Sequence, residues 1–242
     1  MDNDDHSMTT NEKLRAVIFD LDNTLYDYDD AHAVASRAMA DYARRELGLE
    51  ADVFARLYKE AEAEVRRRCG GNCAALHNRL LRCQALLEGL GRPVGHAPRM
   101  AKTYWDALLD VVRPYPGAIE ALARLREMGL AVGVGTNMTA DYQFEKLERI
   151  GAMPCVDFIV TSEEVTAEKP DRRFFDACAE KAGCAPGACA FVGDSLAGDV
   201  RGALDAGMRA VWFCHKQDPS KAIPGAMLVR EFAELPGLLA GL

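Results

Sequence analysis

The sequence predicts an α/β fold in which a doubly wound parallel sheet carries an inserted all-helical domain. Two observations lead to this prediction. Short apolar runs typical of buried parallel strands recur along the chain and alternate with helical patterns. The alternation is interrupted once, between about residues 29 and 113, by a long stretch that has helical periodicity and no convincing strand. A helical block inserted into an alternating fold indicates a second, smaller domain.

The first predicted strand covers residues 15–20, where the run RAVIFD ends abruptly in charge. Near-continuous apolar runs are typical of strands that are buried on both faces. Four further runs of this kind lie at residues 131–136, 158–162, 188–193 and 210–213. Parallel strands joined through helices place those helices on both faces of the sheet. Ligands of such sheets bind at the carboxyl ends of the strands.

Helical patterns fill the segments between the later strands. In the segment 140–150, we expect Phe144, Leu147 and Ile150 to form the apolar face of a helix. The segment 117–128 ends at Gly129, a residue favoured just after a helix. The predicted helices of this part cover residues 117–128, 140–150, 172–182 and 198–206.

The inserted stretch reads as four helices separated by glycines. They are predicted at residues 30–47, 51–68, 73–90 and 97–112. We therefore expect a core domain made of residues 13–27 and 114–242, and a helical domain made of residues 28–113. The polar, acidic residues 1–12 are expected to form a disordered tail.

The composition favours an ordinary enzyme and excludes other classes. The 242 residues are 49% hydrophobic, which is enough to bury a core. A formal net charge of -8, without a long basic run, argues against a nucleic-acid partner. We see no signal peptide and no window of ~18 uninterrupted apolar residues, so we expect no membrane partner and a cytoplasmic location with reduced cysteines. The protein is expected to be a monomer or a homodimer.

Four carboxylates follow two of the predicted strands. Asp20 and Asp22 come at the end of the first strand, and Asp194 and Asp199 follow the fourth. Acids this close together repel one another unless a cation offsets their charge. Oxygen ligands suit a hard dication. The sequence therefore predicts a Mg²⁺ site at this edge of the sheet.

Groups suited to phosphate binding follow the other two strands. Thr136 and Asn137 end the second strand, where a hydroxyl and backbone amides can hold phosphate oxygens. Lys169 comes after the third strand and just before a helix. Its cation can neutralise phosphate charge and reduce the repulsion between the acids and an anionic substrate.

These positions resemble the four ordered motifs of the haloacid dehalogenase superfamily, whose core is Rossmann-like. Each motif alone is a weak signal, whereas four in order at predicted strand ends form a strong one. The helical insertion resembles the helical cap of the superfamily's phosphoglycolate phosphatase and nucleotidase type. The matching residues are Asp20, Asp22, Thr24, Thr136, Lys169, Gly193, Asp194 and Asp199.

The resemblance implies a role for each acid. Asp20 would attack phosphorus and become phosphorylated. Asp22 would protonate the leaving group and then activate water. Asp20, the backbone carbonyl of Asp22, and Asp194 would hold Mg²⁺, and Asp199 would support the metal directly or through water. Thr24 would brace the loop.

The resemblance also implies how the substrate is bound. Thr136, the amide of Asn137, and Lys169 would bind the transferring phosphoryl group. In the helical cap, His77 and Arg79 would contact the leaving group. The alternative, that these two residues belong to a polar helix face, is about equally consistent with the sequence.

The acid at Asp22 separates the chemistries of the superfamily. Its dehalogenases lack an acid at this position, so the resemblance implies a magnesium-dependent phosphatase that acts on a small phosphorylated metabolite. The substrate classes expected are nucleoside monophosphates, sugar phosphates and phosphoglycolate. The alternatives are a phosphomutase of the same superfamily, which keeps the same acids, and a non-catalytic binding or regulatory module.

Overall fold

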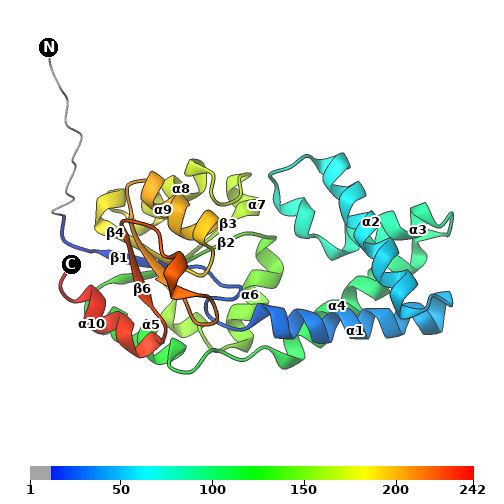
Figure 1. The fold of residues 1–242 in the computed structure, drawn as a ribbon, viewed down its shortest axis with the longest axis horizontal. Coiled ribbons are helices and arrows are strands. Elements are labelled where there is room, and N and C mark those ends of the chain that lie inside the picture. Colours follow the sequence, from blue (N-terminus) through cyan, green and yellow to red (C-terminus); the bar gives the residue numbers. More distant parts are fainter. Residues whose placement is uncertain (1–11) are drawn as a thin grey trace, which may run out of the picture.

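The computed structural model describes residues 12–242, so the predicted tail lies outside the described residues except for its last position. The fold is a six-stranded sheet whose neighbouring strands are all parallel, in the order β3-β2-β1-β4-β5-β6 (Figure 1). Its strands are β1 (Ala16–Phe19), β2 (Ala131–Thr136), β3 (Phe158–Thr161), β4 (Cys189–Gly193), β5 (Arg209–Phe213) and β6 (Ala226–Val229).

The first five strands confirm the prediction, and the sixth was missed. The β6 strand lies at an edge of the sheet and pairs only with β5. Its sequence AMLV is apolar, but three of its four residues are only half-buried. The other edge strand, β3, was predicted although two of its residues are also half-buried, so the edge position alone does not explain why β6 was missed.

Helices cover both faces of the sheet, as the alternating pattern predicted. Along β1, Val17 and Phe19 belong to one hydrophobic core, while Ala16 and Ile18 belong to the other. This alternation is the period of two that a strand imposes. One face is covered by α5 (Ala118–Glu127), α6 (Ala140–Arg149) and α10 (Leu235–Leu239), and the other by α7 (Ser162–Val165), α8 (Arg172–Ala182) and α9 (Arg201–Asp205).

The inserted segment is helical, and in Figure 1 it lies to the right of the sheet and the helices that cover it. We call residues 28–111 the helical block. Its helices are α1 (Tyr28–Leu47), α2 (Ala51–Cys69), α3 (Arg79–Gly89) and α4 (Ala97–Val111).

The prediction of one helix over residues 73–90 was wrong. A short 3₁₀ turn covers residues 74–77, and the chain bends at Asn78 before α3 begins. The side-chain oxygen of Asn78 accepts hydrogen bonds from the backbone amides of Leu80 and Leu81, at 2.9 and 3.2 Å. Asn78 is thus an N-cap, which satisfies amides that the first turn of a helix leaves free.

The two connections of the helical block lie side by side. Tyr26 and Pro114 form an antiparallel bridge, and the backbone amide of Tyr115 donates to the carbonyl of Leu25 at 2.9 Å. The helices α1 and α4, which begin and end the block, run alongside each other (Figure 1).

The helical block also contacts the core at two places away from these connections. The ring of Trp105 in α4 stacks on that of Tyr142 in α6, with centroids 3.8 Å apart. At the other place, the side-chain oxygen of Asn72 accepts a hydrogen bond from the backbone amide of Glu168, at 2.9 Å. The block therefore lies over the carboxyl ends of the strands.

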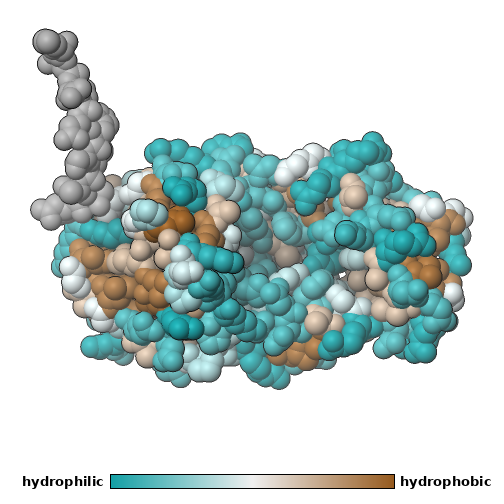
Figure 2. Space-filling model, viewed as in Figure 1, coloured by the Kyte–Doolittle hydropathy of each residue, from teal (hydrophilic) through white to brown (hydrophobic). Residues whose placement is uncertain are grey.

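The surface facing the viewer in Figure 2 is mainly hydrophilic, and its hydrophobic residues form separate patches. None of the helices within residues 12–242 combines the length and the apolar character that crossing a lipid bilayer requires.

Candidate active site

The residues that the sequence analysis selected for the site lie around a single cavity of about 480 Å³. Its walls come from the carboxyl ends of the strands and from the helical block. The selected residues on its lining are Asp20, Asp22, His77, Arg79, Thr136, Asn137, Lys169, Asp194 and Asp199.

Three of the four selected acids form a compact cluster. Asp20 follows β1 and Asp194 follows β4, and these strands are neighbours in the sheet. With Asp199, each offers a carboxylate oxygen that lies within 4.8 Å of the others. The approach needs a glycine at Gly193, where a Cβ would lie 2.4 Å from the Asp199 carboxyl group.

The electrostatics of the cluster favour a bound cation. Burial raises the pKa of Asp20 well above its ordinary value, Lys169 opposes this rise, and Asp199 and Asp194 add to it. Burial and the neighbouring Asp199 raise the pKa of Asp194 to about 7. A raised carboxyl pKa means that the charged form is disfavoured without a further positive charge. An all-oxygen donor set of this kind fits a hard dication.

Lys169 supplies one positive charge beside the cluster. Its Nζ lies 2.5 Å from Oδ1 of Asp20 and 2.8 Å from Oδ1 of Asp199. Although burial acts in the opposite direction, Asp199 and Asp20 raise the pKa of Lys169 above its ordinary value, so the side chain stays protonated. The backbone amide of Lys169 donates to the side-chain oxygen of Asn137 at 3.0 Å, which fixes the two residues relative to each other.

Thr24 lies beneath the acids and connects the loops that carry them. Its hydroxyl lies 3.4 Å from Asp20 Oδ2 and 3.3 Å from Asp194 Oδ1, and it accepts a hydrogen bond from the Asp194 amide at 3.1 Å. The indole nitrogen of Trp212 donates to the Asp194 carbonyl at 2.9 Å. The loop after β4 is therefore held from two sides.

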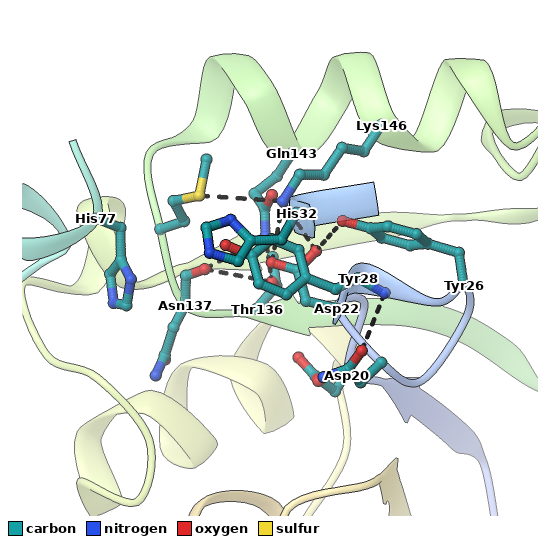
Figure 3. A network of polar contacts seen from close by, with 12 residues as sticks. Asp20, Asp22, Tyr26, Tyr28, His32, His77, Thr136, Asn137, Gln143 and Lys146 are labelled. Atoms are coloured by element: carbon teal, nitrogen blue, oxygen red, sulfur yellow. Dashed lines mark hydrogen bonds and ion pairs between the residues drawn. The ribbon is translucent and has the colours of Figure 1, made fainter. Parts of the chain in front are cut away.

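Thr136 is held by a residue that the sequence analysis did not select. The side-chain nitrogen of Gln143, in α6, donates to the Thr136 hydroxyl and to the Asn137 carbonyl. Gln143 is buried. Figure 3 shows Gln143 beside Thr136 and Asn137, so these contacts fix the end of β2.

Asp22 is held by two further residues that were not selected. Lys146, in α6, places its Nζ 2.8 and 2.9 Å from the two oxygens of Asp22. The hydroxyl of Tyr26 donates to Asp22 at 2.6 Å. Figure 3 shows Lys146 and Tyr26 approaching this carboxylate from different directions. Burial lowers the pKa of Lys146, whose side chain is fully buried, while Asp22 opposes this effect.

The apolar face expected for the segment 140–150 is confirmed in part, because Leu147 and Ile150 are buried but Phe144 is not. Gln143, Lys146 and Leu147 are buried, whereas Phe144 is 41% exposed. The buried face was expected to include Phe144. Positions three apart lie on one side of a helix, so Gln143 and Lys146 point together toward the strand ends.

The two residues selected in the helical block, His77 and Arg79, differ in their contacts and in their burial. His77 Nε2 lies 2.8 Å from Oε1 of Glu168, next to Lys169 in sequence. Arg79 is only 4% exposed and lies among tyrosines. Both residues line the cavity, which makes them available to a ligand there.

In metal-free protein, thermal stability is expected to fall as the pH rises toward the pKa of Asp194. Folding raises that pKa from 3.8 to about 7, so between these values the folded chain binds more protons than the unfolded chain. Stability then decreases with rising pH over this interval. Melting curves in EDTA between about pH 5 and pH 8 should show a decrease in Tm, and Asp194→Asn should flatten it. A Tm that rises equally with pH in both proteins would contradict this prediction.

Enzymes with open α/β sheets bind their ligands at the carboxyl ends of the strands. The clustered carboxylates and the buried lysine of this chain lie at that edge, which places it in this class. Comparison with known proteins identifies the family within this class. The family model described as haloacid dehalogenase-like hydrolase matches residues 14–207. The chain belongs to this family, and the resemblance seen in its motifs is confirmed.

The chain is similar to named phosphatases over most of its length. It is 38% identical over 211 residues to a ribulose-1,5-bisphosphate 5-phosphatase from Halopiger xanaduensis, covering 85% of each chain. It is 36% identical over 203 residues to a glyceraldehyde 3-phosphate phosphatase from Methanopyrus kandleri, covering 82% of this chain and 83% of the relative. The crystal structure of a phosphatase of this family from Thermococcus onnurineus matches with a TM-score of 0.72 and 26% identity, over 94% of this chain and 99% of that one. The protein is accordingly a phosphoric monoester hydrolase.

Proposed function

We propose that this enzyme hydrolyses a small phosphorylated metabolite in a Mg²⁺-dependent reaction, through an aspartyl-phosphate on Asp20. The observation that carries the proposal is the position of Asp20, whose carboxylate contacts Lys169 and lies within 4.8 Å of Asp194 and Asp199. A nucleophile placed between a fixed cation and a cluster of metal-binding oxygens is arranged for phosphoryl transfer.

The proposed reaction has two steps. A carboxylate oxygen of Asp20 attacks phosphorus, the bond from phosphorus to the leaving oxygen breaks, and Asp22 gives that oxygen a proton. Water then attacks the same phosphorus, Asp22 takes a proton from the water, and the bond to Asp20 breaks. Lys146 and Tyr26 hold the Asp22 carboxyl group in position for both proton transfers. Lys169 and Thr136 would hold the phosphoryl oxygens in both steps.

Asp20, Asp194 and Asp199, with the backbone carbonyl of Asp22, would hold the metal ion. A bound Mg²⁺ supplies positive charge that offsets the charge of the transferring phosphoryl group. The raised pKa values of Asp20 and Asp194 support this assignment, because a cluster of buried carboxylates without a dication is electrostatically unfavourable.

We propose that residues 28–113 form a cap domain over a core domain made of residues 13–27 and 114–242. The hydrogen bond from Glu168 to Asn72 and the stack of Trp105 on Tyr142 support it, since they join the two parts at separate places. A cap of this kind excludes water and favours a small substrate.

Phosphorylated sugars are the proposed substrate class, because the relatives described above are named for them. Their being phosphatases favours hydrolysis over the phosphomutase and non-catalytic alternatives. The eight cysteines are free thiols in the structure, which supports a cytoplasmic location.

Phosphate release from a panel of phosphomonoesters, including p-nitrophenyl phosphate, tests the proposal. With Mg²⁺ we expect release, and with EDTA we expect a loss of about 100-fold or more, which added Mg²⁺ restores. Isothermal titration with Mg²⁺ should be run in parallel. Equal release with and without EDTA would contradict the metal dependence, and no release from Mg²⁺-bound protein would contradict the phosphatase assignment.

A further inference from the structure

Two buried arginines lie one turn apart on α3, and their surroundings differ. Arg82 is 8% exposed. Its guanidinium donates to the carbonyl of Leu76 and forms an ion pair with Glu62 at 2.9 Å. A buried charge that has a carboxylate partner and satisfied donors is typical of a structural residue.

Arg79 has no such partner. Its guanidinium donates to the Tyr28 hydroxyl at 2.8 Å, to the Tyr104 hydroxyl at 3.1 Å and to the His77 carbonyl at 2.9 Å. All of these acceptors are neutral. The Nε atom is buried and makes no hydrogen bond. Among the residues that the structure describes, no carboxylate forms an ion pair with Arg79.

The other buried cations near the cavity are neutralised. Lys169 contacts Asp20 and Asp199, and Lys146 contacts both oxygens of Asp22. Arg79 lies with its guanidinium carbon 4.6 Å from the ring centroid of Tyr104. An aromatic face attracts a cation but does not neutralise its charge, so the guanidinium still lacks an anionic partner.

Resting on the proposed function, we infer that Arg79 binds a second anionic group of the substrate, a phosphate or a carboxylate, in the cavity that it shares with Asp20. The substrate is then a small molecule that carries the scissile phosphate and a second anion. Arg79 lines the same cavity as Asp20. Its guanidinium already has neutral acceptors on Nη1 and Nη2, and an oxygen of a second anion would supply the acceptor that Nε lacks together with the missing negative charge. The Tyr28 and Tyr104 hydroxyls hold the guanidinium in place, so little side-chain entropy is lost on binding.

Selectivity between substrates tests this inference. For wild type, Arg79→Gln, Arg79→Lys and the matched control Arg82→Gln, kcat/KM is measured with ribulose 1,5-bisphosphate, 2-phosphoglycolate and p-nitrophenyl phosphate. The ratio of kcat/KM for each substrate with two anionic groups to kcat/KM for p-nitrophenyl phosphate should fall about 100-fold in Arg79→Gln, mainly through KM. It should fall less in Arg79→Lys, which keeps the charge but not the planar set of donors. In Arg82→Gln the ratio should stay unchanged even if Tm falls.

The two substrates with two anionic groups distinguish the sources of the second anion. A fall in the ratio for ribulose 1,5-bisphosphate alone indicates a phosphate, and a fall for 2-phosphoglycolate alone indicates a carboxylate. A direct binding measurement separates recognition from turnover: in an Asp20→Asn background, titration calorimetry with the preferred substrate should show Kd rising about 100-fold on adding Arg79→Gln.

Equal losses on all three substrates, or an unchanged Kd in the Asp20→Asn background, would overturn the inference. The phosphatase proposal fails in a different way. If wild type releases no phosphate even from p-nitrophenyl phosphate, the proposed function is wrong. If it releases phosphate with Mg²⁺ and the selectivity ratio does not depend on Arg79, only the second-anion inference is wrong.

Discussion

Replacing Asp20 with Asn is expected to lower kcat by about 10⁴-fold or more, because an amide oxygen is a poor nucleophile toward phosphorus. The fold should survive. The pKa of Asp20 is raised by burial, so its charged form is disfavoured in the metal-free protein, and Asn has nearly the same shape. In EDTA, the Tm of Asp20→Asn should therefore equal or exceed that of wild type, whereas its phosphate release should be lost.

An exposed acid on the same sheet domain provides the control. Asp176, in α8, is exposed and pairs with Arg172 on the surface, so Asp176→Asn should keep full activity. Acid quenching during turnover of a radiolabelled substrate should leave label on wild type and on Asp176→Asn, but not on Asp20→Asn. Label retained on Asp20→Asn would place the covalent intermediate on another residue.

The ion pair between Lys146 and Asp22 is expected to be asymmetric in its effect on stability. Lys146 is fully buried, whereas the Asp22 side chain is 25% exposed. Asp22→Asn leaves an ammonium group buried without a partner and should lower the free energy of unfolding by about 3–5 kcal/mol. Lys146→Met leaves a carboxylate that water can reach, and should cost about 1–3 kcal/mol. Urea unfolding at neutral pH measures both.

Two further measurements test whether Lys146 and Asp22 stabilise the fold as a coupled pair or independently of each other. Asp22→Asn with Lys146→Met should be less destabilised than the sum of the single variants, because it leaves no unpaired charge. In Asp22→Asn alone, Lys146 loses the attraction that opposes its lowered pKa. The unfolded chain then binds more protons than the folded chain above the folded-state pKa, so stability should rise with pH. Additive losses that do not depend on pH would rule out the pair as an energetic unit.

The core of the fold could be predicted because each of its parts leaves a local pattern. The run of β1 ends directly at Asp20, and parallel pairing of β1 with β4 then brings Asp194 beside it. Strand polarity alone was therefore enough to place the acids at one edge.

The residues that support the site could not be predicted in the same way. Lys146 and Gln143 occur in a helix of mixed polarity, where a lysine is ordinarily exposed. Their burial depends on contacts with Asp22 and Thr136, which are distant in sequence and become neighbours only through the packing of α6 on the sheet. The break at Asn78 was missed because its capping hydrogen bonds compete locally with an otherwise continuous helical pattern.

The entry and exit of the helical block lie side by side, because Tyr26 pairs with Pro114 and the Tyr115 amide donates to the Leu25 carbonyl. The insertion therefore connects β1 to the rest of the sheet domain as a long loop would, with its two ends held together. The entropy of closing a loop grows only slowly with its length, so insertions of other lengths can be grafted here at little thermodynamic cost to the sheet. The helical block, which we propose contacts the distal part of a ligand, can therefore vary in length while the proposed nucleophile Asp20 stays at the end of β1.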